Sequence, residues 1–301
     1  MLTYKQVFAK AWEVAKLHPR LWVFGVFAAV LTRVLQAGMI IFWDTLATNG
    51  VFNISLADLW QVGLDSPVRF LTAQTMLFFI VVVMLVMVWL VLAAQAALVY
   101  ETLQAAAHRT TGWGELVRVG FRKSWGMLAL YGLALLIAWA LLLPFSFISN
   151  PQGPVAFLGY LLAFVLIIPL IAVIFLVLKY AVCGMVLHQQ PVGQALAQGT
   201  QLFSRHWLLT VEVGFLLFVL FGAIRYVVSF LIGLALIGAL VVQDIPGVQV
   251  TAQFLFGALD LAVGTILAVF SWTAWVTVYE SLLNPRVRFA SFLQRMFGGA
   301  Q

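Results

Sequence analysis

Two oppositely charged side chains, Arg225 and Asp260, stand inside long apolar stretches of the sequence. A charge inside an apolar helix is costly unless it is paired or hydrated, so each is a candidate functional group. Arg225 lies 18 residues after Trp207, and Asp260 lies 19 residues before Tyr279. As helices, both charges would then lie about 27 to 28 Å from the same end of a hairpin. The matched depth predicts an ion pair that fixes the register of two helices, with a proton or substrate relay as the alternative.

Two further charges could extend a polar path. Arg33 lies about 16 Å inside its own apolar stretch with no acid at its level, so it would reach toward the interface or face a polar cavity. Glu212 is close enough along its helix to reach Arg205 or Lys179. Together with the pair above, Arg33 and Glu212 would line the path of a transporter or channel if a hydrated cavity joined all four.

The residue types of most metal and catalytic centres are sparse. Cys183 is the single cysteine, which excludes an internal disulfide and favours a packed small residue. The sequence contains no phosphate-binding glycine loop, dinucleotide fingerprint or nucleophile elbow. The histidines show no zinc spacing and fall at one end of the apolar segments: His18, His108, His188 and His206. We therefore expect a protein that is not an enzyme and holds no cofactor.

Composition defines the broad class. Of 301 residues, 64% are hydrophobic and 9% are charged, which leaves too little polar surface to cover a soluble globule. The apolar segments are long and do not alternate, so they indicate helices rather than barrel strands. We predict a single all-α membrane domain over residues 1–301. The formal charge of +6 does not indicate nucleic acid, because no water-exposed domain gathers it.

Six segments have the length of a membrane span. They are expected at 21–43, 70–99, 125–149, 155–179, from 207 onward, and at 251–279. The run after Trp207 continues to Val242, which as a helix exceeds about 50 Å. Because a hydrocarbon core is about 30 Å thick, we expect this helix to leave the core near Arg225. Residues 227–242 would then re-enter the membrane or lie on its outer surface; one long tilted helix is the alternative.

Amphipathic helices are predicted before the first, third and fifth spans and after the last. The first follows Thr3 and ends before Pro19. The second covers residues 115–121, the third begins near Pro191, and the last follows Pro285. Such helices lie on the membrane surface.

The distribution of basic residues sets the orientation. Lys and Arg gather on one side, whereas the other side has only Arg69 among several acids, so the positive-inside rule places both termini in the cytoplasm and the protein in a cell (inner) membrane. The basic residues of the cytoplasmic side are Lys5, Lys10, Lys16, Arg20, Arg109, Arg118, Arg122, Lys123, Lys179, Arg205, Arg286, Arg288 and Arg295.

The surface helix and hairpin recur three times, as parallel units over residues 3–108, 109–188 and 189–297. Each unit enters through a basic residue and a tryptophan and returns to a tyrosine; the tryptophans are Trp22, Trp125 and Trp207, and the tyrosines Tyr100, Tyr180 and Tyr279. Glutamate follows two of these tyrosines, as Glu101 and Glu280, where we expect solvated or locally paired carboxylates. An aromatic belt at the membrane interface would also collect such residues without any repeat.

This pattern resembles bacterial six-span membrane proteins, among them the membrane domain attached to some glycerophosphodiester phosphodiesterases. The resemblance rests on Trp22, Trp125, Trp207 and the two Tyr-Glu pairs, and covers nearly the whole chain. It implies a membrane-embedded helper or lipid-associated module and transfers no catalytic residue.

The favoured hypothesis is a non-enzymatic accessory, scaffold or lipid-associated membrane protein. Its partners would be membrane lipids, with partner subunits or a homo-oligomer as further options. The basic side chains next to the spans would contact anionic headgroups, or would only set the topology; they are Arg118, Arg122, Lys123, Arg286 and Arg288. The alternative is a small-solute or ion transporter or channel that uses the four intramembrane charges.

Overall fold

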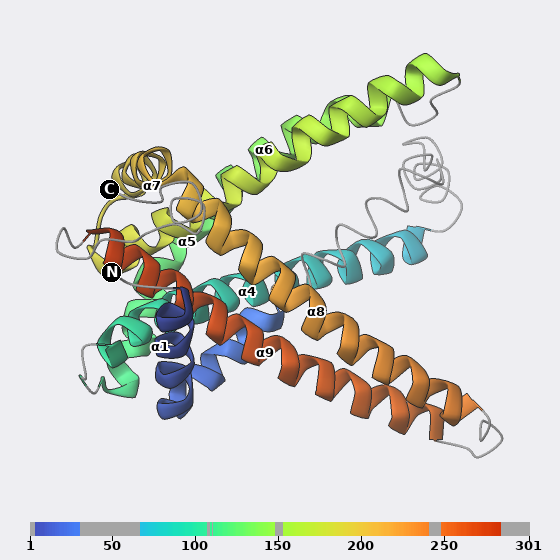
Figure 1. Cartoon of the computed structure of the whole chain (residues 1–301). Coiled ribbons are helices and arrows are strands. Elements are labelled where there is room, and N and C mark those ends of the chain that lie inside the picture. The colour runs from blue at the N-terminus through green and yellow to red at the C-terminus, as the bar shows by residue number, and fades with distance from the viewer. Residues whose placement is uncertain are drawn as a thin grey trace.

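The computed structural model describes residues 4–30, 67–106, 109, 111–147, 153–240 and 248–283, and all regular structure in them is α-helical. Five of these helices are long and apolar enough to cross a membrane. They are α4 (Pro67–Ala106), α5 (Trp113–Phe147), α6 (Pro154–Leu187), α8 (Trp207–Leu240) and α9 (Val248–Leu283) (Figure 1). The predicted all-helical class is confirmed, and the apolar helices indicate a multi-pass membrane protein.

The first expected span is described in part. Residues Pro19–Val30 form an apolar helix that packs on α9, where a Cβ added to Gly25 would lie 2.4 Å from Cγ2 of Val269. The remainder of this segment, with Arg33, lies outside the described residues, as does the C-terminal segment that holds Arg286 and Arg288.

The long helices converge at one end and diverge at the other (Figure 1). In α4, residues 91–99 are buried and Tyr100 is half-buried, whereas residues 82–87 are exposed. In α6, residues 180–186 are buried and residues 164–166 are exposed. The tertiary core therefore occupies the converged end, where α9 contacts α1, α4, α6 and α8.

Small residues allow the helices of the converged end to approach closely. A Cβ added to Gly120 in α5 would lie 2.6 Å from the carbonyl oxygen of Ala93 and 3.5 Å from Cβ of Ala97, both in α4. Such contacts are the main way in which membrane helices gain packing energy, since lipid removes the hydrophobic drive between them. The approach of α4 to α5 thus depends on a residue without a side chain.

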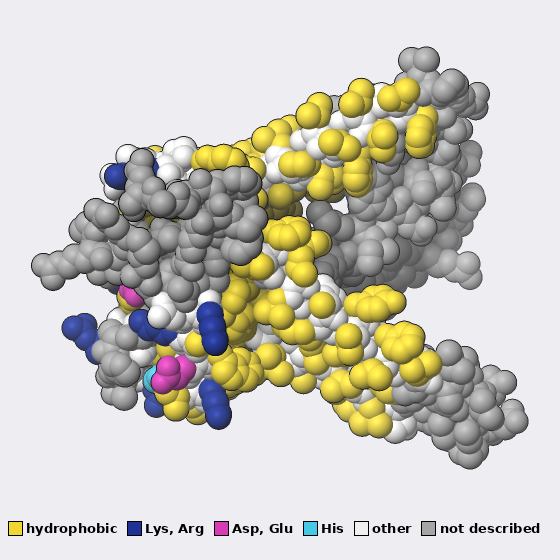
Figure 2. All heavy atoms as spheres, in the orientation of Figure 1, with side chains coloured by type: hydrophobic (Ala, Val, Ile, Leu, Met, Phe, Trp, Pro, Cys, Tyr) yellow, Lys and Arg dark blue, Asp and Glu magenta, His cyan; other side chains and the backbone are white. Residues whose placement is uncertain are grey.

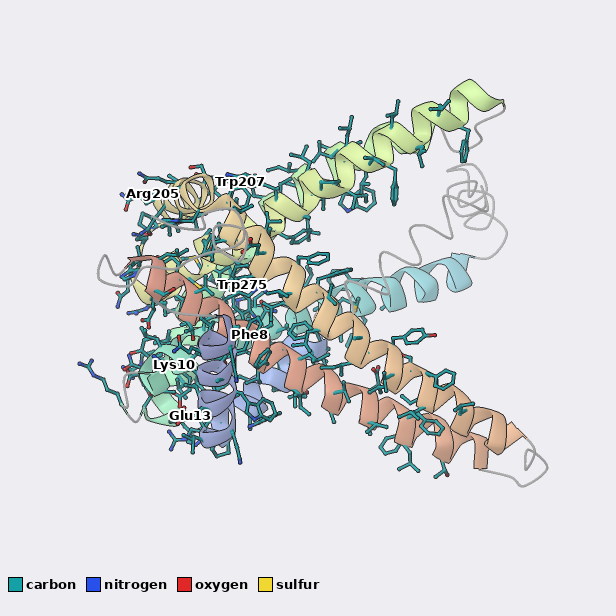
Figure 3. All side chains as sticks on the ribbon, in the orientation of Figure 1. Phe8, Lys10, Glu13, Arg205, Trp207 and Trp275 are labelled. Carbon is teal, nitrogen blue, oxygen red and sulfur yellow. The ribbon has the colours of Figure 1, made fainter. Side chains whose placement is uncertain are left out.

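Two amphipathic helices cover the converged end. α1 (Tyr4–Leu17) turns Val7 and Ala11 inward, and its Phe8 ring lies 5.8 Å from that of Phe270 in α9. Lys10 and Glu13 point away from the bundle (Figure 3). α7 (Val192–Arg205) follows Pro191 and buries its small residues on α6. Both segments are helical as predicted; their place on a membrane surface stays a prediction.

The prediction of a separate second surface helix over residues 115–121 is wrong. Residues 115–121 are the first turns of α5, which continues without a break to Phe147. The segment contains no proline, and the hydroxyl of Ser124 donates to the carbonyl oxygen of Phe121 at 2.8 Å, within the helix. By contrast, α1 ends before His18 and Pro19, and α7 ends at His206.

The expected break near Arg225 is also wrong. α8 is continuous over 34 residues, and its hairpin partner α9 has 36. No proline lies near Arg225, and opening a helix in apolar surroundings would leave backbone groups without partners. The other three long helices have 34 to 40 residues, so length beyond a hydrocarbon core is shared by all five and is not peculiar to α8.

The α4–α5 contact predicts a sharp difference between two glycines of α5. Gly120→Ala should lower the free energy of unfolding by about 1–3 kcal/mol, because the new methyl group would overlap a backbone carbonyl. Gly132→Ala is the matched control, since a Cβ there meets nothing within 4 Å. Thermal unfolding in detergent measures both, and equal melting temperatures for the two variants would contradict the close approach.

Candidate functional site

A partly open pocket of about 260 Å³ lies at the converged end, lined by His18, Pro19, Arg20 and Glu101. It joins the junction between α1 and the helix Pro19–Val30 to the end of α4. The pocket lies between the predicted start of the first span, at Arg20 and Trp22, and the predicted end of the second span, just after Tyr100. The pocket thus brings together one basic and one acidic side chain from distant parts of the chain.

The local fold at the pocket follows from proline and tryptophan. Proline suits the first turn of a helix and disfavours a helical residue before it, which ends α1. The backbone N–H of Leu21 then donates to the carbonyl oxygen of His18 at 3.1 Å. The indole N–H of Trp22 donates back to the carbonyl oxygen of Ala15 at 3.0 Å. These bonds fix the angle between the two helices, and hence the position of Arg20.

Arg20 is held by two groups from the start of α5. Its guanidinium donates to the backbone carbonyl oxygen of Thr111, and its Cζ lies 5.5 Å from the ring centroid of Trp113. A hydrogen bond and a cation–π contact together orient a planar guanidinium well. Arg20 was expected only as one of the residues that set topology; its contacts depend on the fold and have no signal in the sequence.

Glu101 is a buried carboxylate and not the solvated one that we expected. Its residue is 2% exposed, and its Oε2 has no hydrogen-bond partner among the described residues. The hydroxyl of Thr111 is likewise buried without a partner among them. From its sequence position we expected Glu101 at the end of a helix, next to water. Instead, α4 continues to Ala106 and α1 packs against α4, so the side chain of Glu101 is buried.

The intramembrane charges predicted from sequence fall outside this pocket. Arg225 and Asp260 are half-buried and lie in α8 and α9, which contact each other. Glu212 is half-buried near the start of α8. Their pairing and any polar path through them stay predictions.

The basic residues predicted to contact headgroups lie in the first half of α5. Arg118 and Arg122 are exposed one helical turn apart, and Lys123 is half-buried. Figure 2 shows charged side chains gathered at the converged end, while hydrophobic side chains cover the diverging helices. This separation is the distribution that a membrane interface imposes.

Two of the tyrosines at the ends of the predicted return spans bond to the next long helix. The hydroxyl of Tyr100 donates to Oε1 of Glu115 in α5 at 2.8 Å, and the hydroxyls of Tyr180 and Thr210 in α8 are 2.8 Å apart. The rings of Tyr180 and Trp275 meet edge to face at 5.7 Å. Cys183 is buried in the same core, as predicted.

An aromatic ring of a neighbouring helix accommodates the amine of Lys179 inside the bundle. Its Nζ lies 3.6 Å from the ring centroid of Trp272 in α9, and a cation over an indole is attracted by the ring quadrupole. The cation therefore has a partner inside the bundle, and no ligand is required to explain it.

No family model matches this chain, and comparisons with curated proteins and with solved structures find no similar one. The function must accordingly be inferred from the residues themselves.

Arg20→Lys should reveal how firmly Arg20 holds the pocket. The ammonium cannot reproduce both the stacking on Trp113 and the geometry of the bond to Thr111, so the variant should lose about 1–3 kcal/mol of stability. Arg118→Lys, at an exposed position, is the matched control and should change the melting temperature little. If both variants have the melting temperature of the wild type, Arg20 has no positioning role.

A double-mutant cycle tests the predicted pair in the α8–α9 hairpin. If Arg225 and Asp260 interact, each single change to Ala should destabilise more than the double change, with a coupling energy of about 1–3 kcal/mol. Thermal unfolding of the three variants and the wild type in detergent gives the cycle. Additive losses would show that the two charges act independently.

Proposed function

We propose that the protein is a non-enzymatic, lipid-associated membrane protein of accessory or scaffold type. It crosses the membrane six times, with the converged end and both termini on the cytoplasmic side. The observation that carries the proposal is the contrast between the two ends of the helices. Charged side chains and the packed core share one end, and exposed apolar side chains cover the other.

The exposed apolar surface is large and continuous along the diverging helices. Phe78 in α4, Phe218 in α8 and Phe254 in α9 are all more than two-thirds exposed. An exposed apolar surface of this extent needs an apolar environment. Acyl chains between the diverging helices supply one, while the amphipathic helices α1 and α7 would lie at headgroup level.

The repeat supports a scaffold in which similar units pack around one core. Two of the three exit tyrosines bond to a long helix of the following unit. Tyr279 differs, because its hydroxyl donates to Oε1 of Gln198 in α7 of its own unit at 3.4 Å. The three parallel units, 3–108, 109–188 and 189–297, remain part of the proposal.

The alternative of a transporter or channel requires a polar path through the membrane. The pocket at Glu101 lies at the converged end, whereas Arg225 and Asp260 lie in the part of the hairpin with exposed apolar neighbours. The lipid-associated function needs no such path. It also accounts for the exposed apolar side chains of the diverging helices.

Lipid retention is the direct test. Protein extracted in mild detergent and washed should keep phospholipid bound, and removing that lipid should lower its melting temperature, because a ligand that binds only the folded state stabilises it. Phosphate analysis and thermal unfolding measure the two effects. A protein that keeps no phospholipid and is unaffected by added lipid would contradict the proposal.

The exposed arginines of α5 allow a matched comparison within the same test. In bilayer discs of phosphatidylglycerol, the variant Arg118→Gln/Arg122→Gln should lose about 1 kcal/mol of binding energy per removed charge. In discs of phosphatidylcholine, which carries no net charge, wild type and variant should behave alike. Equal stabilisation of both proteins by phosphatidylglycerol would show that these arginines only set topology.

A further inference from the structure

The pocket at the converged end holds a buried carboxylate, one oxygen of which has no hydrogen-bond partner among the described residues. Glu101 is buried, lines the pocket, and its Oε2 has no hydrogen-bond partner among the described residues. A buried carboxylate without a partner is expensive, so such groups are paired in folded proteins. The geometry therefore calls for a donor, and a positive one, in the pocket.

The opposite charge in the pocket is Arg20, whose guanidinium carries several N–H donors. Arg20 has five N–H groups in a planar fork, and among the described residues one hydrogen bond, to the carbonyl oxygen of Thr111, is made by its side chain. The contact with Trp113 adds a cation–π interaction, with Cζ 5.5 Å from the ring centroid. An arginine held in this way is well suited to a phosphate.

These two charges define a zwitterionic ligand with an amine and a phosphate. A bound metal ion would require several oxygen or nitrogen ligands, but the described residues include no group of three His, Cys, Asp or Glu side chains. A primary ammonium instead suits a single carboxylate. The volume of about 260 Å³ is below that of sites for drug-sized molecules and is adequate for a small headgroup.

The position of the pocket favours a lipid as the source of this group. It lies where the helix Pro19–Val30 begins and near the end of α4, and Trp22 is two residues beyond Arg20 in its lining. Tryptophans at the ends of apolar helices lie at headgroup depth. We propose that this pocket binds the phosphoethanolamine headgroup of phosphatidylethanolamine, with the ammonium on Glu101 and the phosphate on Arg20.

The inference rests on the proposed lipid-associated function and adds a headgroup preference to it. Phosphatidylcholine is the discriminating competitor, because its trimethylated ammonium has the same charge but no N–H to donate. The intact chain is placed in bilayer discs of equimolar phosphatidylethanolamine and phosphatidylcholine with identical acyl chains. The lipid that remains bound after extraction is then identified by native mass spectrometry.

We expect phosphatidylethanolamine to be enriched about tenfold, the ratio that one charge-assisted hydrogen bond provides. Glu101→Gln should sharply reduce the enrichment, because a neutral amide oxygen accepts a hydrogen bond from the ammonium more weakly than a carboxylate does. Arg20→Gln should reduce retention of both lipids. Glu13→Gln, which removes an exposed carboxylate from α1, is the matched control and should leave the enrichment intact.

The outcomes separate this inference from the function on which it rests. If the wild type keeps phospholipid without preference, or if Glu101→Gln leaves the preference unchanged, the headgroup site is wrong and the lipid-associated function stands. If no phospholipid is kept at all, both fail. Should Glu101→Gln not fold, the wild-type ratio of the two lipids still decides.

A second arm distinguishes a lipid from a soluble ligand with the same chemistry. Free phosphoethanolamine is added to the detergent-purified protein, and the melting temperature is compared with that in free phosphocholine. A rise only with phosphoethanolamine that Glu101→Gln removes, without enrichment of the lipid, would overturn the lipid assignment and give the pocket to a soluble amine phosphate. Enrichment of the lipid supports the proposal as stated.

Discussion

The close approach of α4 and α5 at Gly120 is the contact on which the converged end depends. A Cβ there would lie 2.6 Å from the carbonyl oxygen of Ala93, so the helix axes can be this near only at a glycine. Gly25 against Val269, and Gly199 against the backbone of α6, repeat the same solution. In lipid, where apolar surface gains little from helix contact, such small-residue interfaces supply much of the packing energy. Among the described residues of the diverging halves, a Cβ added to Gly159, Gly222, Gly233 or Gly257 would meet nothing within 4 Å.

Polar groups at the converged end then have partners that only this packing provides. Tyr100 reaches Glu115 of the next long helix, and Arg20 is held by Thr111 and Trp113. The bond of Arg20 is half-buried, so leaving one of its groups unpaired would cost more than the bond itself contributes. The arrangement concentrates the specific interactions in one layer. Glu101, a buried carboxylate whose Oε2 has no partner among the described residues, makes the layer a candidate binding site.

Much of the fold follows from local sequence. The apolar segments have the length and composition of spanning helices, Pro19 and Pro191 delimit surface helices, and Cys183 is buried as its apolar neighbours indicate. The candidate site was not predictable in the same way. Glu101 follows an exit tyrosine as Glu280 does, and nothing in that pattern distinguishes a covered carboxylate from a half-buried one.

The sequence by itself thus determined the helical class, the surface helices α1 and α7, and the gathering of charge at one end, because hydrophobicity, proline and charge act locally along the chain. Tertiary structure alone decided that α5 absorbs the second surface helix, that α8 continues past Arg225, and that Glu101 is buried beside Arg20. Burial and pairing depend on which distant segments meet. A helix end that looks solvent-exposed in sequence becomes interior once another helix lies against it.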